Sequence, residues 1–328
     1  MKRIIKKIKV IVIIYHIFQN FCAGLKYKWG DNGTDIVPHS DFGGDVNANV
    51  RHAVNVFDGY FENSDLTRDS VRGMRVLEVG PGDSFGVALK FLSKGARQVV
   101  CIDRFRCARD AEIEKATYQA LRQDLTLEER QSFDEAISLD DGVKVNPDRL
   151  RYIHDVALEE AANSLEPGSF DLIVSAAVLE HIYDSDRAFE AMHRLLKPGG
   201  LMLHGVDFRD HGVFTSGGHH PLTFLTISDP VYRSMSVNTG LPNRNLVDYY
   251  RGKLAKLGYE VRILVTRVVG RTEPVYPHKE NLSFGEDYTD ATLSLIDKIR
   301  PRLRSRFQAL SNDDLMISAA FLAVRKPA

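Results

Sequence analysis

Two patterns of hydrophobic positions follow one another along the chain. From Met1 to Phe18, apolar residues recur every three or four positions between lysines, which is typical of a basic amphipathic helix. Beyond residue 70, short β-branched runs alternate with stretches of helical spacing. Strands that alternate with helices predict a mostly parallel sheet covered on both faces. The chain is therefore expected to form a basic arm and a doubly wound α/β domain.

The elements of this domain are predicted in regular order, after a helix whose apolar positions run from Val50 to Phe61. The expected strands are 75–79, 98–103, 150–154, 170–175, 201–206, 259–268 and 316–324. The expected helices are 85–92, 184–196, 246–257 and 287–310. The second of these helices should stop at Lys197-Pro198-Gly199-Gly200, because proline and glycine do not continue a helix, and Pro301 should break the last.

Three segments are too long to be simple connections in such a sheet. Counted inclusively, 103–155 spans 53 residues and 208–245 spans 38. We expect helical insertions that form a cap at about 104–149, 208–245 and 270–314. The predicted organisation is an arm at 1–30, a linker rich in glycine and aspartate at 30–45, and one domain at 46–328.

Composition and charge narrow the class of protein. With 328 residues, 44% of them hydrophobic and 27% charged, the chain is neither wholly disordered nor a polytopic membrane protein. Three cysteines without a CxxC pair exclude a disulfide framework and indicate a reducing compartment. The net charge of -1 conceals seven basic and no acidic residues in 1–30, so the body is acidic. An acidic body without a basic, aromatic-rich face argues against nucleic acid as a partner.

The arm has three interpretations that its spacing leaves open. Its apolar run is far shorter than the ~20 residues that a membrane-spanning helix needs. It could contact a membrane surface through residues 1–24, dock on the domain, or act as a targeting signal.

A glycine-rich turn follows the first predicted strand, at Glu78 to Gly86. Such a turn lets a ligand approach main-chain amides, because a Cβ atom there would collide with it. The spacing from Gly80 through Gly82 to Gly86 is Gly-x-Gly-x-x-x-Gly, which does not match the dinucleotide fingerprint. The turn alone is compatible with nicotinamide, flavin and other nucleotide cofactors.

Two aspartates end the next two predicted strands. Asp103 lies twenty-one residues beyond Gly82, where a carboxylate can accept hydrogen bonds from two ribose hydroxyls. Asp155 follows His154 at the end of the third strand, where it can accept a hydrogen bond from an adenine amino group. Both residues indicate a nucleoside-containing cofactor.

Six motifs in this order give the chain a resemblance to the class I S-adenosylmethionine-dependent methyltransferases. They are Glu78 to Gly86, Cys101-Ile102-Asp103, His154-Asp155-Val156, Phe170 to Ser175, Val178-Leu179-Glu180-His181 and Leu196 to Gly200. The resemblance covers roughly 70–207, and the last two strands would complete the family's sheet. It implies a Rossmann-like methyltransferase fold and S-adenosyl-L-methionine as the cofactor.

The resemblance also assigns expected roles in the cofactor site. Glu78, Gly80 and Gly82 would shape the methionine side, and Asp103 would hold the ribose. Asp155 and Val156 would face adenine. Ser175 and Ala176 would lie beneath the sulfonium, while Glu180-His181 would be structural or at the pocket edge.

The acceptor site is expected just after the fifth strand. A sulfonium makes the methyl group electrophilic, so the protein must mainly align the acceptor, but a hydroxyl also needs a base or a metal. The candidates in this segment are Asp207, Asp210, His211, His219 and His220. A histidine base, led by His211, is favoured over a metal, so no metal site is predicted.

A second, looser resemblance concerns Asp207 to His211 and Asn243-Arg244-Asn245. These segments look like a subgroup that acts in bacterial saccharide and cell-surface biosynthesis, which implies a sugar or sugar-lipid hydroxyl as acceptor. Arg209 or Arg244 would then pair with a phosphate or carboxylate. The alternative is that both arginines form surface ion pairs.

The sequence thus predicts an S-adenosylmethionine-dependent enzyme that O-methylates a polar small molecule, saccharide or lipid-linked saccharide. It is expected in the cytoplasm, with peripheral contact at the inner face of the membrane as an option. The alternatives are an NAD(P)-dependent oxidoreductase, because an acid about 20 residues beyond the glycines also fits one, and a non-catalytic S-adenosylmethionine-binding protein.

Overall fold

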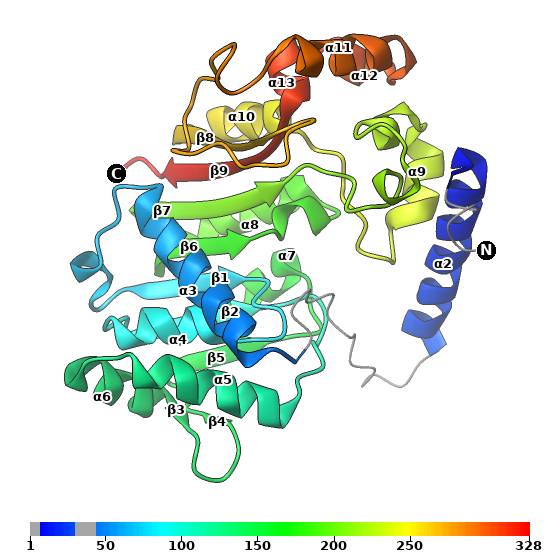
Figure 1. The fold of residues 1–328 in the computed structure, drawn as a ribbon. Helices are drawn as coiled ribbons and strands as arrows, with labels where there is room; N and C mark the ends of the chain where they lie inside the picture. Colours follow the sequence, from blue (N-terminus) through cyan, green and yellow to red (C-terminus); the bar gives the residue numbers. More distant parts are fainter. Residues whose placement is uncertain (1–6, 30–43) are drawn as a thin grey trace. The chain divides into compact units, whose positions relative to one another are not determined.

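The computed structural model describes residues 7–29 and 44–328 (Figure 1). The start of the predicted arm and most of the predicted linker lie outside these residues. The chain divides into two compact units. Unit 1 comprises Met1–Asn32, Ala177–Ser185 and Gly205–Leu322, and unit 2 comprises Gly33–Ala176, Asp186–His204 and Ala323–Ala328.

A seven-stranded sheet has the strand order β5-β2-β1-β6-β7-β9-β8. Its strands are β1 (Arg75–Val79), β2 (Gln98–Ile102), β5 (Leu150–Ile153), β6 (Phe170–Ala176), β7 (Leu196–Asp207), β8 (Glu260–Val268) and β9 (Ile317–Arg325). β1 pairs in parallel with β2 and β6, and β2 pairs in parallel with β5. The predicted doubly wound α/β fold is confirmed.

The strand order reverses at β1. The chain runs outward from β1 to β2 and β5, and β6 then returns to the other side of β1. Loops at the carboxyl ends of β1 and β6 therefore diverge, which is where open α/β sheets bind ligands. The strands here are buried on both faces, as Val76, Leu77 and Val174 show with no exposed surface.

Helices of unit 2 pack around a short central helix. The helices are α3 (Val46–Glu62), α4 (Gly86–Ser93), α5 (Ala111–Gln123), α6 (Leu127–Ala136) and α7 (Leu158–Ala161). α4 contacts α3, α5 and α6, and the rings of Phe57 and Phe91 meet edge to face at 4.9 Å. The predicted insertion 104–149 consists of α5, α6 and the hairpin of β3 (Ile137–Ser138) and β4 (Lys144–Val145).

Local sequence signals explain where the insertion's helices begin. Asp110 caps α5 by accepting hydrogen bonds from the amides of Glu112 and Ile113. Thr126 and Glu129 form a capping box at the start of α6. Helix α8 (Ser185–Leu195) follows β6 and leads into β7.

Unit 1 carries the arm and the other two insertions. Its helices are α2 (Lys9–Trp29), α9 (Asp229–Ser236), α10 (Val247–Lys256), α11 (Asp290–Ile299), α12 (Ser305–Gln308) and α13 (Asn312–Met316). α2, dark blue in Figure 1, packs against α9. The side-chain oxygen of Asn20 accepts a hydrogen bond from the amide of Asn238 at 2.6 Å. The arm therefore docks through one face.

Two predicted boundaries were wrong, and one predicted helix break was found. The first helix continues beyond Phe18 to Trp29. β7 begins at Leu196 rather than Leu201, because Gly199 and Gly200 exchange backbone hydrogen bonds with the chain's C-terminal end. The last predicted helix is divided into α11 and α12 by a turn at Arg300–Arg302, which contains Pro301 as expected. Within the described residues, no helix is long and apolar enough to cross a membrane.

Candidate functional site

The glycine turn after β1 adopts a conformation that requires its glycines. Gly80 and Gly82 have φ angles of 70° and 66°, in the left-handed region that favours glycine. The Gly80 amide donates to the Ile102 carbonyl at 2.8 Å, which ties the turn to the end of β2. A Cβ atom on Gly82 would meet nothing within 4 Å, so it would occupy open space. A ligand can use that space to approach the backbone.

Asp103 lies beside this turn, as the sequence predicted. Its Oδ2 atom accepts a hydrogen bond from the Gly82 amide at 3.3 Å, and its Oδ1 atom accepts one from the Phe105 amide at 3.3 Å. Burial raises the pKa of Asp103. Residues twenty-one positions apart thus meet at the carboxyl ends of adjacent strands.

Glu78 is buried in β1, directly before the turn. The thiol of Cys101 donates to its Oε2 atom at 3.5 Å, and only 5% of the residue is exposed. Burial raises the pKa of Glu78 to about 7, so the carboxyl group changes charge near neutral pH. Its assignment to the methionine side of the cofactor stays a prediction.

Two residues that brace the glycine turn were not predicted from the sequence. Arg109 donates from Nη2 to the Gly82 carbonyl at 3.1 Å, and its guanidinium lies 3.5 Å from the ring centroid of Phe85. The Tyr118 hydroxyl accepts from the Phe85 amide at 2.7 Å. Arg109 and Tyr118 belong to the insertion 104–149. Only the spacing of Glu114 and Tyr118 on one face of α5 could have indicated that this insertion supports the site.

The residues predicted for adenine and the sulfonium lie near the ends of β5 and β6. Asp155 has a φ of 61°, and its carboxylate accepts from the Arg106 amide at 3.0 Å and lies 2.7 Å from Nδ1 of His154. Val156 is half-buried beside it, and Ala176 ends β6. Ser175 is buried, and its hydroxyl lies 2.8 Å from Nδ1 of His204. Their roles toward a ligand stay predictions.

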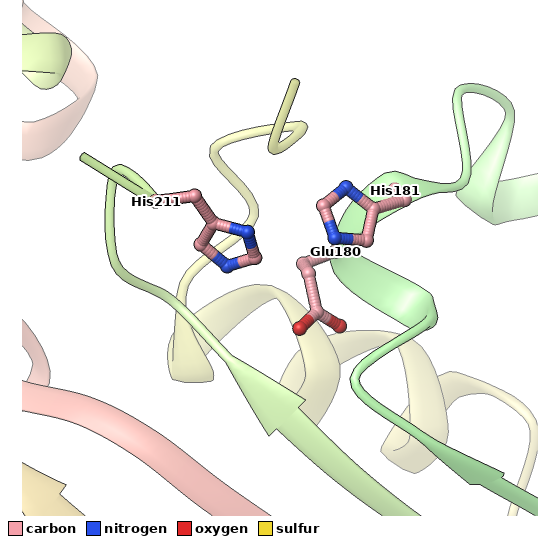
Figure 2. A group of neighbouring side chains, drawn as sticks. All are labelled: Glu180, His181 and His211. Carbon is pink, nitrogen blue, oxygen red and sulfur yellow. The ribbon is translucent and has the colours of Figure 1, made fainter. Parts of the chain in front are cut away.

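A second group of polar side chains lies in unit 1. Glu180 and His181 belong to the 3-10 turn Leu179–His181, and His211 follows β7. Each offers one atom to a set whose members all lie within 4.8 Å of one another. Figure 2 shows the two imidazole rings facing each other and the carboxyl group of Glu180 beside them. The rings of His181 and His211 meet edge to face at 4.9 Å.

Glu180 is the buried member of this group, with 1% of the residue exposed. Its Oε1 atom accepts a hydrogen bond from the Asp207 amide at 3.0 Å. Its Oε2 atom is buried and has no hydrogen-bond partner among the described residues. Burial raises the pKa of Glu180 to about 8. The sequence treated Glu180-His181 as structural or peripheral, and the distance from His211 along the chain hid their proximity.

The other predicted catalytic residues do not join this group. Asp210 is buried, and its two oxygens accept hydrogen bonds from the amides of Gly212, Phe214 and Thr215 and from the Thr215 hydroxyl. His220 accepts the Leu222 amide at Nδ1 and lies 3.0 Å from the Leu295 carbonyl at Nε2. Asp210 therefore shapes its own loop, and His220 links this loop to α11.

His219 and Asp207 have different surroundings. The ring of His219 lies 6.1 Å from that of Phe214, edge to face. Asp207 pairs with Arg209 through Nε at 2.9 Å and lies 3.8 Å from Nε2 of His211. Burial acts to raise the pKa of Asp207, but hydrogen bonds from Arg209 outweigh it and leave the pKa lowered.

The expectation that Arg244 lies at the surface was wrong, whereas a role as an anion ligand stays a prediction. Arg244 is 5% exposed, and its Nη1 atom donates to the carbonyl of Ile227 at 2.7 Å. Its guanidinium also pairs with Asp229 and lies 4.1 Å from the ring centroid of Tyr232. Arg244 therefore holds the insertion 208–245 together. Arg209 has half of its side chain exposed and forms the expected ion pair, with Asp207.

Known methyltransferases share sequence with this chain. A methyltransferase domain family model matches residues 55–251. The ubiquinone biosynthesis O-methyltransferase of Xanthomonas euvesicatoria pv. vesicatoria (strain 85-10) is 31% identical over 137 residues, which are 42% of this chain and 44% of that protein. The chain thus matches less than half the length of this relative.

Two solved structures are also similar. Phosphoethanolamine N-methyltransferase 2 of Haemonchus contortus, in complex with S-adenosyl-L-methionine, has 18% identity and a TM-score of 0.42, covering 92% of this chain and 56% of its own. An S-adenosylmethionine-dependent methyltransferase from Mesorhizobium loti has 16% identity and a TM-score of 0.41. The match covers 84% of this chain and 100% of that one. The methyltransferase domain model matches more than half of this chain. The chain therefore belongs to the methyltransferase domain family of S-adenosylmethionine-dependent enzymes.

Proposed function

We propose that the protein is an S-adenosylmethionine-dependent methyltransferase that transfers a methyl group to an oxygen of a polar small molecule or saccharide, free or lipid-linked. The observation that carries this proposal is the pairing of the Gly82 amide with the Asp103 carboxylate at the point where the strand order reverses. When bound, the cofactor supplies an electrophilic methyl group on a sulfonium.

The residues of unit 2 fit this cofactor. Asp103 accepts hydrogen bonds through its carboxylate, as two ribose hydroxyls require. The open space beside Gly82 admits a ligand to the backbone. Glu78 places a buried carboxyl group at the start of the turn, where its charge can respond to a cationic ligand.

The acceptor side of the proposal rests on unit 1. A hydroxyl group is a weak nucleophile, so a base must take its proton as the carbon–oxygen bond forms. His211 is partly exposed, with 30% of its side chain accessible, and an imidazole nitrogen can accept a proton. His211 is therefore the proposed base, with Glu180 and His181 positioned beside it.

Calorimetric titration with S-adenosylhomocysteine tests the cofactor. Wild-type protein should bind it, and Asp103→Ala should weaken binding at least tenfold because the ribose hydroxyls lose their acceptor. Asp140→Ala, which removes an exposed carboxylate from the insertion 104–149, should bind as wild type does. NADH is titrated alongside. Absence of S-adenosylhomocysteine binding, or a preference for NADH, would overturn the proposal in favour of an oxidoreductase.

The proposal includes a partner for α2, namely an anionic lipid surface. The side of α2 that does not contact α9 carries a row of exposed apolar side chains at helical spacing. They include Val10 (62%), Ile14 (60%), Phe18 (64%) and Phe21 (62%). Lys7 is exposed at the start of this row. An exposed apolar face that begins at a basic residue matches helices that lie in the plane of a membrane interface.

Sedimentation with lipid vesicles tests this partner. Wild-type protein should bind vesicles rich in phosphatidylglycerol more strongly than phosphatidylcholine vesicles, and the double variant Phe18→Ser, Phe21→Ser should lose most of this binding. Phe284→Ser, at another exposed phenylalanine of unit 1, serves as the matched control. Equal binding by the double variant would contradict the proposal. Self-association that the double variant abolishes would instead assign this face to a second copy of the chain.

A further inference from the structure

We propose that Glu180, His181 and His211 form a binding site for one divalent transition-metal ion. The sequence predicted no metal site, because a histidine base was favoured over a metal. The inference refines the proposed function at the acceptor side: a bound ion would replace His211 as the group that activates the acceptor hydroxyl.

The first argument for the metal site is the geometry of the three donor atoms. One carboxylate oxygen and two imidazole nitrogens lie within 4.8 Å of one another, and Figure 2 shows the three side chains as neighbours. Metal–ligand bonds of about 2.1 Å bring donor atoms to roughly 3.4 Å apart in a tetrahedral site. Small rotations of side chains would close that difference, and the His211 side chain, which is 30% exposed, has room for them.

The second argument for the metal site is a carboxylate oxygen of Glu180 that lacks a hydrogen-bond donor among the described residues. Buried carboxylate oxygens are almost always hydrogen-bonded, because an unpaired polar atom costs about 1–3 kcal/mol. Oε1 of Glu180 has the Asp207 amide as its donor, whereas Oε2 is buried without a partner among the described residues. An ion bound beside Oε2 would satisfy this oxygen and neutralise the carboxylate.

The third argument for the metal site is the hydrogen bond that orients the His181 ring. Its Nδ1 atom lies 2.6 Å from the carbonyl oxygen of Gly240, which can only accept, so Nδ1 carries the proton. Nε2 of a neutral imidazole then has a lone pair for a metal. A metal-ligating histidine characteristically donates its other N–H to a backbone carbonyl or carboxylate, which fixes the ring's orientation.

Other contacts hold the turn that bears two of the three ligands. The side-chain amide of Asn243 donates to the carbonyls of Leu179 and Ile182 at 2.8 and 2.9 Å. Its backbone amide donates to the Glu180 carbonyl at 2.6 Å. Glu180 and His181 are therefore fixed at their backbone, as a preorganised ligand pair requires.

The donor set indicates the class of ion. Two imidazoles and one carboxylate favour Zn²⁺, Co²⁺, Fe²⁺ or Ni²⁺ over Mg²⁺ and Ca²⁺, which prefer oxygen ligands. Three protein ligands leave at least one coordination position open, as in catalytic rather than structural zinc sites. That position suits an oxygen of the acceptor, whose hydroxyl pKa the ion would lower so that the proton leaves to solvent.

Titration of the metal-free protein with Co²⁺ tests the site through visible absorption. We expect one equivalent to bind with the ligand-field bands of a nitrogen- and oxygen-coordinated ion, and Zn²⁺ to displace it. His211→Ala and the nearly isosteric Glu180→Gln should each weaken binding at least tenfold. His278→Ala, which removes an imidazole elsewhere in unit 1, should leave it unchanged. Far-UV circular dichroism confirms that each variant is folded.

Two results would overturn the site. One is a wild-type protein that takes up no Co²⁺ or Zn²⁺, and the other is a His211→Ala variant that binds the ion as tightly as wild type. S-adenosylhomocysteine titration of the same samples separates this inference from the proposed function. Cofactor binding without metal binding rejects the site alone, whereas metal binding without cofactor binding rejects the methyltransferase proposal alone.

Discussion

Arg109 and Gly82 are joined by a hydrogen bond of 3.1 Å from the guanidinium to the backbone carbonyl of the glycine turn. Arg109 is anchored in turn by Glu114, at 3.3 Å, and by the ring of Phe85. Because Gly82 also donates its amide to Asp103, both polar groups of this glycine are held by side chains. The turn is thus fixed by residues from two strands and an insertion.

Replacing Arg109 should weaken cofactor binding without unfolding the protein. Arg109→Ala frees the Gly82 carbonyl and removes a cation stacked on Phe85, so the turn becomes less well ordered. A hydrogen bond to a charged group contributes about 1.5–3 kcal/mol, and we expect a loss of affinity for S-adenosylhomocysteine of about tenfold. Calorimetry measures it. Arg97→Ala, at an exposed arginine of unit 2, is the control, and equal affinities would reject the bracing role.

The cofactor side could be predicted from sequence because parallel strands fix it. Gly82 and Asp103 follow adjacent strands whose carboxyl ends share an edge, so a strand assignment alone brings them together. Arg109 could not be found in this way, because its position depends on how the insertion 104–149 folds back. Likewise, His211 meets Glu180 only through a tertiary arrangement of two loops. Arg244 was misassigned because nothing local shows that an arginine is buried.

The buried carboxyl group of Glu78 should make stability depend on pH. Its pKa rises from 4.5 to about 7 on folding, because burial penalises the charged form. The folded state therefore keeps a proton that the unfolded chain releases above pH 4.5. The stabilisation is fully present below that pH and is lost as the pH rises through 7, about 3 kcal/mol in all.

Glu78→Gln removes this titration. The variant's free energy of unfolding, relative to wild type, should therefore increase between pH 4.5 and pH 8 by about 3 kcal/mol. Urea unfolding at the two pH values measures the change. Glu62→Gln, at an exposed position of α3, should show none. A difference for Glu78→Gln that is the same at both pH values would mean that Glu78 is already ionised in the folded protein.

Substitution of Arg244 should reduce the protein's stability much more than substitution of Arg209. Arg244→Ala leaves the carbonyls of Ile227 and Phe224 without their donor and Tyr232 without its cation. Breaking such a buried arrangement costs about 3 kcal/mol or more. Arg209→Ala removes a half-exposed ion pair and should change stability by less than about 1 kcal/mol. Urea unfolding compares them. A stable Arg244→Ala variant that had lost only acceptor binding would restore Arg244 as a ligand residue.

Asn243 should matter for the turn that carries Glu180 and His181. Its side-chain amide donates to the carbonyls of Leu179 and Ile182 and reaches the Ser185 hydroxyl at 3.2 Å. Asn243→Ala leaves the two carbonyls without this donor, which should lower the free energy of unfolding by about 2 kcal/mol.

The matched comparison is Asn245→Ala, because Asn245 donates from its side chain to the same Ser185 hydroxyl, at 3.0 Å, but not to the turn's carbonyls. It should cost about 1 kcal/mol or less. The backbone bond from Asn243 to the Glu180 carbonyl survives both substitutions, so the turn should remain in place but be held less firmly. We therefore expect Asn243→Ala to weaken Co²⁺ binding severalfold and Asn245→Ala to leave it unchanged. If the two variants changed stability equally and metal affinity equally, the turn would not depend on Asn243.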